Sequence, residues 1–167
     1  AWSPDSQEVD LSRILAGSEG TLAFITEAKL NITPIAKFKT LINIKYDSFD
    51  SALRNSPFLV AANATSVETV DSKVLNLAKE DVVWQTVSEL IEDVPGKVMN
   101  GLNMVEFNDE NEASQKDKVE SLCQRLDQLI KNNEQGVIGY QVTTDLNAIS
   151  RIYGMRKKAV GLLGKTD

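Results

Sequence analysis

Near the N-terminus the period of apolar residues changes from helical to strand-like. Residues 11–16 place their apolar side chains at helical spacing, with Asp10 as a suitable N-cap and Gly17 as a stop signal. From Thr21 the apolar positions repeat every second residue until Pro34 interrupts them. We therefore predict a short helix, a glycine turn and one long strand over residues 21–32.

Beyond Phe38 the pattern predicts a second unit. Alternating or β-branched stretches predict strands at 38–46, 64–70, 101–107 and 136–144. Helical spacing predicts helices at 47–55, 56–63, 72–80, 81–94, 114–133 and 145–163. The second of these begins at Ser56 as N-cap with Pro57 in the first turn, and Asp71 and Asp145 are the expected caps of two others.

The order of these elements predicts the fold class. Between residues 38 and 144 it is β-α-β, a helical insert, and β-α-β, which is the split β-α-β or ferredoxin-like α+β arrangement. We expect an antiparallel sheet with helices on one face. Residues 1–36, with the terminal strand, and residues 37–167 are then separate domains.

Composition narrows the classes of partner. The chain has 167 residues, a formal net charge of −6 and 42% hydrophobic residues, which is ordinary for a globular protein. The acidic balance argues against a nucleic-acid partner or an anionic membrane surface. No apolar run approaches the length of a transmembrane helix. The single cysteine fits a reducing compartment, so we expect a cytoplasmic protein and leave peripheral membrane association open.

The absence of histidine restricts the chemistry further. Without His, a Ser-His-Asp or Cys-His catalytic unit cannot form within this chain. A metal site would depend on carboxylates alone, and the acidic stretch 106–117 lacks the spacing of a calcium loop, so we predict no metal site. The chain begins "AWSPDSQ" without an initiator Met, and we expect a fragment of a larger protein.

The stretch "LAGSEGTLAFITEAKL", residues 15–30, is the first candidate for binding chemistry. It is neither a P-loop nor a dinucleotide-binding fingerprint, because no Gly-Lys-Ser/Thr follows and the order is helix to strand. Spacing alone favours a tight turn in which glycine supplies a positive φ. The hydroxyl and amide groups would also suit phosphate oxygens, so both interpretations stay open.

Arg156 is the second candidate. A helix that begins at Asp145 places it on the same face as Ile149, Ile152, Tyr153 and Val160. A single charge on an apolar face suits an anion-binding role, but an arginine in the last part of a helix can also extend to solvent and favour the helix dipole. Lys157 and Lys158 point away from this face and are expected to be solvated. By spacing, Cys123 lies in a core stripe, and burial is the default for Trp84.

Three motifs carry a family resemblance. "GSEGTLAFITEAKLNITP" resembles the end of the FAD-binding domain in FAD-linked oxidases of the vanillyl-alcohol oxidase type, and departs from the usual pattern at Ala23 and Phe24. "TSVETVDSKVLNLA" resembles a cap-domain segment with a VE-x-x-D core at Val67, Glu68 and Asp71, and "YGMRKKAVGLLG" resembles a W-x-x-R-K segment. The D-2-hydroxyacid dehydrogenase branch, with D-lactate and D-2-hydroxyglutarate dehydrogenases and the glycolate oxidase flavin subunit, is the most similar.

The resemblance implies a flavoenzyme that oxidises a small D-2-hydroxyacid, with hydride passing to FAD. Arg156 would bind the substrate carboxylate, and the wall of the FAD site would include Gly17, Ser18, Glu19, Gly20, Thr21 and Ile25. Glu19 either contacts the cofactor or braces the turn. The base is commonly a His in this family, so we expect no catalytic residue in this chain.

As a fragment the chain would be inactive, would bind no FAD, and would need the rest of its own polypeptide. The alternative is a non-catalytic ferredoxin-like binding or assembly module.

Overall fold

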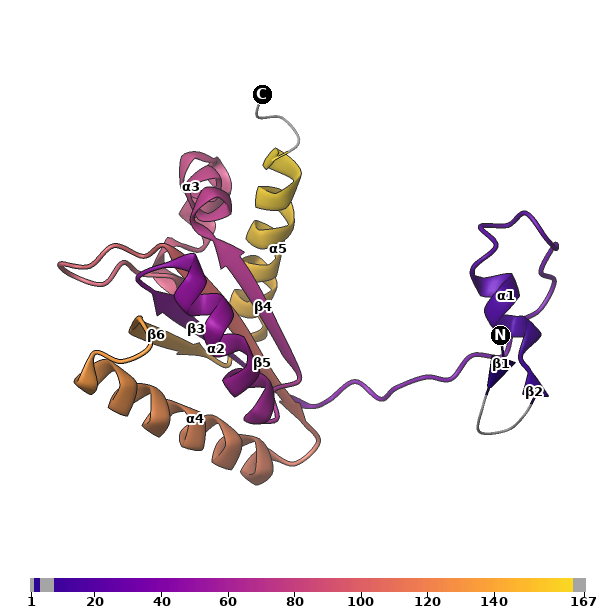
Figure 1. Ribbon diagram of the computed structural model, residues 1–167, viewed down its shortest axis with the longest axis horizontal. Helices are drawn as coiled ribbons and strands as arrows, with labels where there is room; N and C mark the ends of the chain where they lie inside the picture. The colour runs from indigo at the N-terminus through magenta and orange to yellow at the C-terminus, as the bar shows by residue number, and fades with distance from the viewer. Residues whose placement is uncertain (1, 4–7, 164–167) are drawn as a thin grey trace. The chain divides into compact units, whose positions relative to one another are not determined.

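The first compact unit is small. The computed structural model describes residues 2–3 and 8–163, and the chain divides into units 1–34 and 35–167. In the first unit β1 (Trp2–Ser3) pairs antiparallel with β2 (Glu8–Val9), and α1 (Leu11–Ala16) follows (Figure 1). The Asp10 carboxylate accepts from the Ser12 backbone N–H at 2.9 Å, which confirms the predicted cap. The polar, proline-containing residues 1–9 are typical of the end of a linker, and residues 1 and 4–7 lie outside the described part of the chain.

The predicted long strand over residues 21–32 is wrong. Residues 23–36 carry no regular secondary structure, and the side chains of Phe24 and Ile32 are each 91% exposed. Alternation alone does not make a strand, because its N–H and C=O groups need a neighbouring strand to bond with. No described strand pairs with this segment.

The second unit contains the predicted sheet. Its strands are β3 (Phe38–Tyr46), β4 (Ser66–Asp71), β5 (Gly101–Asp109) and β6 (Val137–Thr143). They lie in the order β4-β5-β3-β6, and each neighbouring pair is antiparallel. This order is that of a ferredoxin-like sheet, so the predicted α+β class is confirmed.

Four α-helices accompany the sheet: α2 (Phe49–Ala61), α3 (Ser72–Glu80), α4 (Glu112–Asn132) and α5 (Leu146–Leu163). Ser48, Asp71 and Asn111 cap the first three through side-chain oxygens, and Asp145 accepts from the Ala148 N–H at 2.7 Å in α5. The predicted restart at Ser56 is wrong, because α2 continues through Pro57. Proline removes only one helical N–H there, and the Ser56 hydroxyl donates to the Ala52 carbonyl at 3.1 Å.

The predicted helix over residues 81–94 is also wrong. Two 3₁₀ segments, η1 (Val82–Thr86) and η2 (Ser88–Leu90), are followed by an extended loop. The Leu90 and Glu92 carbonyls accept hydrogen bonds from side chains of β3 instead of from a helical backbone. Bonds to the sheet therefore replace the ladder that an α-helix would need.

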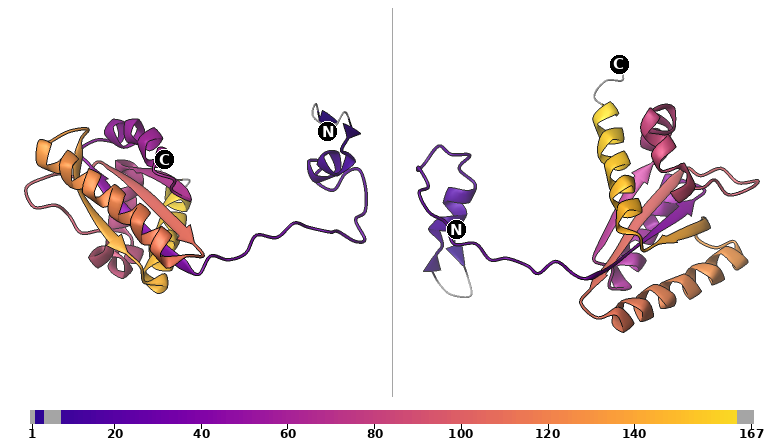
Figure 2. Two further views of the ribbon diagram at one scale, coloured as in Figure 1. Left: turned by 90° about the horizontal axis from the view of Figure 1, so that it is seen from below. Right: turned by 180° about the vertical axis from the view of Figure 1, so that it is seen from behind.

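Helices cover both faces of the sheet, which corrects the expected single layer. Ile42, Ile44 and Tyr46 of β3 pack in one core with α2 and α4. Leu41, the neighbour of Ile42, packs in a second core with α3, α5 and the 3₁₀ insert. α4 and α5 accordingly lie on opposite sides of the sheet (Figure 2). The sheet has no solvated face, and its polar side chains must find partners inside.

Candidate functional site

The predicted tight turn forms at residues 18–21, but Gly17 does not have the positive φ that was expected of its glycines. The Thr21 N–H donates to the Ser18 carbonyl at 3.0 Å, and the central residues Glu19 and Gly20 have φ of 50° and 79°. Two positive φ angles at the centre are typical of a type I′ turn. Gly17 has φ of −88° and only ends α1, so the prediction that glycine supplies a positive φ holds for Gly20 alone.

The hydroxyl groups of this turn are already engaged. Ser18 Oγ donates to the Leu15 carbonyl at 2.8 Å, and Thr21 Oγ1 donates to the Ser18 carbonyl at 2.6 Å. Gly20 is exposed, with no atom within 4 Å of where a Cβ would lie, and Ile25 is 62% exposed. The turn therefore presents an approachable backbone edge. Its hydroxyls brace the turn.

Arg156 lies at the edge of the buried face of α5 and pairs with a carboxylate of β4. Its Nε is 2.8 Å from Glu68 Oε2, and the two side chains are 39% and 29% exposed. Oε2 is buried and accepts no aligned hydrogen bond, so the contact is one of charge with charge. Two of the motifs of the sequence thus meet in space, because α5 packs over the strand that carries Glu68. Sequence reasoning gave Glu68 no role.

A second polar group continues along the same face of the sheet. Glu106 of β5 is 6% exposed, and its Oε1 lies 3.2 Å from Lys39 Nζ and accepts from Asn108 Nδ2 at 2.6 Å. Tyr153, one turn before Arg156 on α5, is partly buried beside it. Burial raises the pKa of the Tyr153 phenol, and the nearby Glu106 and Glu68 carboxylates raise it further. On the α5 face of the sheet, Arg156 therefore lies near polar side chains that are buried or partly buried.

The immediate cavity at Arg156 is small. It has a volume of about 150 Å³ and is lined by residues of four helices and strands, which are Phe49, Thr69, Val70, Asp71, Val74, Arg156 and Val160. The cavity alone cannot enclose a cofactor, but it is suited to one end of a small acid.

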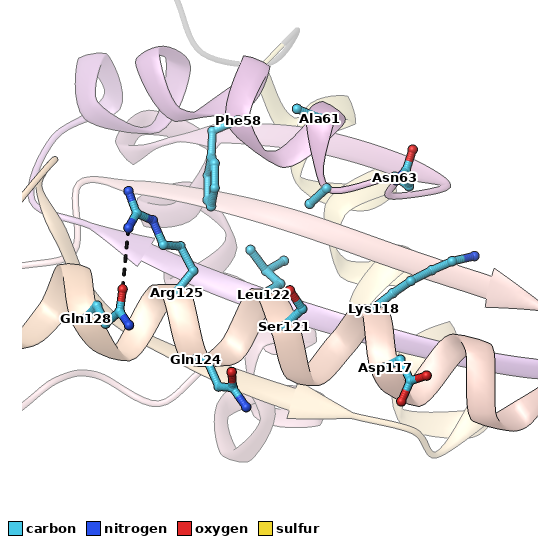
Figure 3. Close-up of a pocket in the computed structure, with 11 residues that line it drawn as sticks. Phe58, Ala61, Asn63, Asp117, Lys118, Ser121, Leu122, Gln124, Arg125 and Gln128 are labelled. Carbon is cyan, nitrogen blue, oxygen red and sulfur yellow. Dashed lines mark hydrogen bonds between the residues drawn. The ribbon is translucent and has the colours of Figure 1, made fainter.

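A larger cavity of about 670 Å³ lies between α2 and α4, on the opposite face of the sheet. Figure 3 shows Phe58 and Leu122 along it, with polar side chains of α4 such as Arg125 and Gln128 at its rim. Arg125 donates to Gln128 at 3.4 Å. None of the residues predicted to bind substrate or cofactor lines this groove.

Three predictions about individual side chains can be compared with the structure. Lys158 is exposed, as expected, and its Nζ lies 2.7 Å from Asp81 Oδ1. Cys123 is partly buried against the α2/α4 core, and desolvation raises its thiol pKa. Trp84 is partly buried against the α5 core, with Lys79 Nζ 5.4 Å from its ring centroid.

Lys45 is a polar residue of the α5 face that the sequence pattern missed. It is 3% exposed, donates to the Glu92 carbonyl, and donates to Gln141 Oε1 at 2.7 Å. Alternation along β3 places Lys45 on the face opposite to Ile42 and Ile44, which a single layer of helices would leave open to solvent. Only a second covered face explains its burial.

Two kinds of feature are absent from the residues that the structure describes. No group of three or more His, Cys, Asp or Glu side chains is placed to hold a metal ion among residues 2–3 and 8–163. In the same part of the chain, no helix has both the length and the hydropathy to cross a membrane.

The sequence matches the family described as FAD linked oxidases, C-terminal domain, over residues 35–166, and the chain belongs to that family. FAD is therefore the cofactor of the enzyme class concerned, as the motifs implied.

Named relatives are similar over almost the whole chain. It is 63% identical over 163 residues to D-2-hydroxyglutarate dehydrogenase of Escherichia coli K12, covering 98% of this chain and 16% of that protein. The corresponding enzyme of Pantoea ananatis is 59% identical with the same coverage. That of Pseudomonas putida is 40% identical over 158 residues, covering 95% of this chain and 15% of the relative. The chain thus spans about a sixth of the length of these relatives.

Proposed function

We propose that this chain is part of an FAD-dependent dehydrogenase that oxidises a D-2-hydroxyacid, and that the acid is D-2-hydroxyglutarate. The observation that carries the proposal is the position of Arg156 at the rim of a small cavity, half-buried and paired through Nε. The names of the relatives and the family match support the choice of reaction and acid. They favour an enzyme over the alternative of an assembly module.

Arg156 would bind the substrate carboxylate. A guanidinium offers two parallel N–H donors to a carboxylate, and its charge persists at any working pH. A fixed carboxylate fixes the position of the α-carbon that must lose its hydrogen.

Oxidation of the 2-hydroxyacid to the 2-oxoacid removes a hydride from the α-carbon and a proton from the hydroxyl group. The bound flavin supplies the hydride acceptor. Because this chain contains no His, we place the base that takes the proton in another part of the polypeptide.

We also propose that the glycine turn forms one wall of the FAD site, within a segment 1–36 that ends the FAD-binding domain. The residues concerned are Gly17, Ser18, Glu19, Gly20, Thr21 and Ile25. An exposed turn with an approachable backbone supports this assignment. By itself the chain would hold only this part of the site, so titration with FAD should give no tight yellow complex. A tight complex would contradict the assignment.

The single, partly buried cysteine supports a location in the reducing cytoplasm. Cell fractionation of the full-length protein tests this location. Recovery with the membrane fraction at low salt, and release at high salt, would instead indicate peripheral association.

Substitution of Arg156 in the full-length protein tests the proposed reaction. Arg156→Ala should lower kcat/KM for D-2-hydroxyglutarate by an amount equivalent to about 2 to 5 kcal/mol. Arg156→Lys should recover only part of the loss, because a lysine keeps the charge without the planar fork. Lys157→Ala is the matched control, since this adjacent cation is exposed on α5. Equal kinetics for Arg156→Ala and the control would remove Arg156 from the site.

A further inference from the structure

We propose that Glu68 is a positioning residue for Arg156. Its carboxylate holds the Nε edge of the guanidinium, so that the two terminal nitrogens face the substrate carboxylate. This inference rests on the proposed function, because it assigns Arg156 the role described above. It gives a task to the glutamate of the VE-x-x-D motif.

The geometry of the pair carries the inference. An arginine presents donors along two useful edges, one that includes Nε and one formed by the two terminal nitrogens. Glu68 Oε2 lies 2.8 Å from Nε, which occupies the first edge and leaves the second. Because the guanidinium is planar, a fixed Nε edge also sets the direction of the other edge. No other carboxylate in the described part of the chain lies within 4 Å of an Arg156 nitrogen.

Glu68 is itself held in place. It lies within β4, where its Cα partner in the antiparallel register is Met104 of β5. Its neighbours along the strand are anchored as well, because Val70 is 4% exposed in the α5 core and the Asp71 carboxylate accepts from the Val74 N–H at 2.8 Å. A side chain on a paired strand is a firm support for an arginine that extends from a helix.

The other carboxylate on this face is committed elsewhere. Glu106 is engaged by Lys39 and by the Asn108 amide, so it does not compete for Arg156. Glu106 pairs with Lys39, and Glu68 pairs with Arg156. The edge of the guanidinium formed by its two terminal nitrogens therefore has no carboxylate beside it among the described residues. The net charge of the pair is zero until an anionic substrate arrives.

A purely structural role is the competing explanation, because an ion pair can fasten α5 to the sheet. Two other pairs already fasten this helix. Arg151 lies 2.8 Å from Glu89, and Lys158 lies 2.7 Å from Asp81. The Arg151–Glu89 pair has the same N···O distance of 2.8 Å, a more exposed carboxylate (54% against 29%) and no proposed role in binding, so Glu89→Ala serves as the control for loss of an ion pair on α5.

The test uses the full-length flavoprotein with four variants: Glu68→Ala, Glu68→Gln, Arg156→Ala and the double variant Glu68→Ala/Arg156→Ala. We measure KM and kcat with D-2-hydroxyglutarate, the equilibrium Kd for 2-oxoglutarate by calorimetry, and the melting temperature. Glu68→Ala should raise KM and Kd about tenfold with a smaller change in kcat. Glu68→Gln should recover little of the loss, because the contact with Nε is one of charge with charge and the amide carries no charge. The double variant should be no worse than Arg156→Ala.

Each contrary result is distinct. If Glu68→Ala lowers the melting temperature as Glu89→Ala does and leaves KM and Kd unchanged, Glu68 only stabilises the packing of α5 on the sheet. The inference is then wrong. If its effect multiplies that of Arg156→Ala, Glu68 acts independently of Arg156 and the inference is also wrong. If Arg156→Ala itself changes neither KM nor Kd, the proposed function and the role of Glu68 fail together.

Discussion

Lys45 and Glu92 share one acceptor, the side-chain oxygen of Gln141. The Lys45 ammonium donates to Gln141 Oε1 at 2.7 Å, and the Glu92 backbone N–H donates to the same oxygen at 2.7 Å. Through this oxygen β3 and β6 hold the loop that follows the 3₁₀ insert against the α5 face of the sheet. A buried ammonium is tolerated there because oxygen atoms surround it.

Removal of the shared acceptor should destabilise the insert. Gln141→Ala leaves the Lys45 ammonium with fewer acceptors and the Glu92 N–H without one, so we expect a loss of about 2 kcal/mol in the free energy of unfolding. Urea titration of the purified chain measures it. Gln128→Ala, at the exposed end of a 3.4 Å contact on α4, is the control and should change stability by less than about 0.5 kcal/mol. Equal losses for Gln141→Ala and Gln128→Ala would mean that the hydrogen bonds to Gln141 Oε1 contribute nothing to stability.

The same cluster predicts an alkaline effect. Burial lowers the pKa of Lys45 below its ordinary value, while the Glu92 and Asp93 carboxylates partly oppose the shift. Between the lowered folded pKa and the unfolded pKa, the unfolded chain binds more protons, so this lysine favours the folded state increasingly as pH rises. The stability of the natural chain relative to Lys45→Met should therefore rise between the two pKa values. A difference that is flat from neutral pH to pH about 10 would contradict this.

Two adjacent residues of β3 test whether both faces of the sheet are cores. Leu41 and Ile42 are each 0% exposed, on opposite faces. Leu41→Ala and Ile42→Ala should each reduce the free energy of unfolding by about 2 to 5 kcal/mol. Val142→Ala on β6, where the side chain is 43% exposed, should cost less than about 1 kcal/mol. A sheet with one solvated face would make one of the first two variants nearly neutral.

Asp71 of the VE-x-x-D motif is predicted to act only as a helix cap. Its carboxylate accepts from the Val74 N–H at 2.8 Å at the start of α3. Asp71→Ala should cost about 1 kcal/mol of stability, and Asp71→Asn should cost little because asparagine caps as well as aspartate. Chemical denaturation of both variants checks this. If Asp71→Asn were as damaging as the alanine variant, the negative charge would have a further role.

Acid should weaken the folded state through Asp109. Hydrogen bonds from Lys118, the Asn111 N–H and the Ser114 hydroxyl hold the pKa of this carboxyl well below its ordinary value. A depressed folded pKa gives a contribution that is present above the unfolded pKa and is lost as pH falls through the folded pKa. Asp109→Asn should therefore lose less stability than the natural chain as pH falls below about 4. If the free energy of unfolding of the two chains fell equally as pH was lowered, this prediction would be wrong.

Much of the fold follows from local patterns. The sheet strands and the long helix α4 are found where alternation and the apolar stripe place them, because those periods record which side is buried. The insert was misjudged since its carbonyls bond to Asn43 and Lys45 rather than within a helix. Within the candidate site, the apolar face of α5 predicts where Arg156 lies. No local pattern pairs it with Glu68, which lies far away along the chain.

By itself, the sequence determined the order of strands along the chain, the helix caps at Asp10, Asp71 and Asp145, and the family, because each depends on residues close together or on a shared motif. Only the tertiary structure decided that both faces of the sheet are covered, that Lys45 is buried and that Arg156 meets Glu68. These outcomes depend on which segments pack over which face, a property of the whole folded unit. The strand-like run after the glycine turn shows the same limit, because an alternating segment becomes a strand only beside a partner.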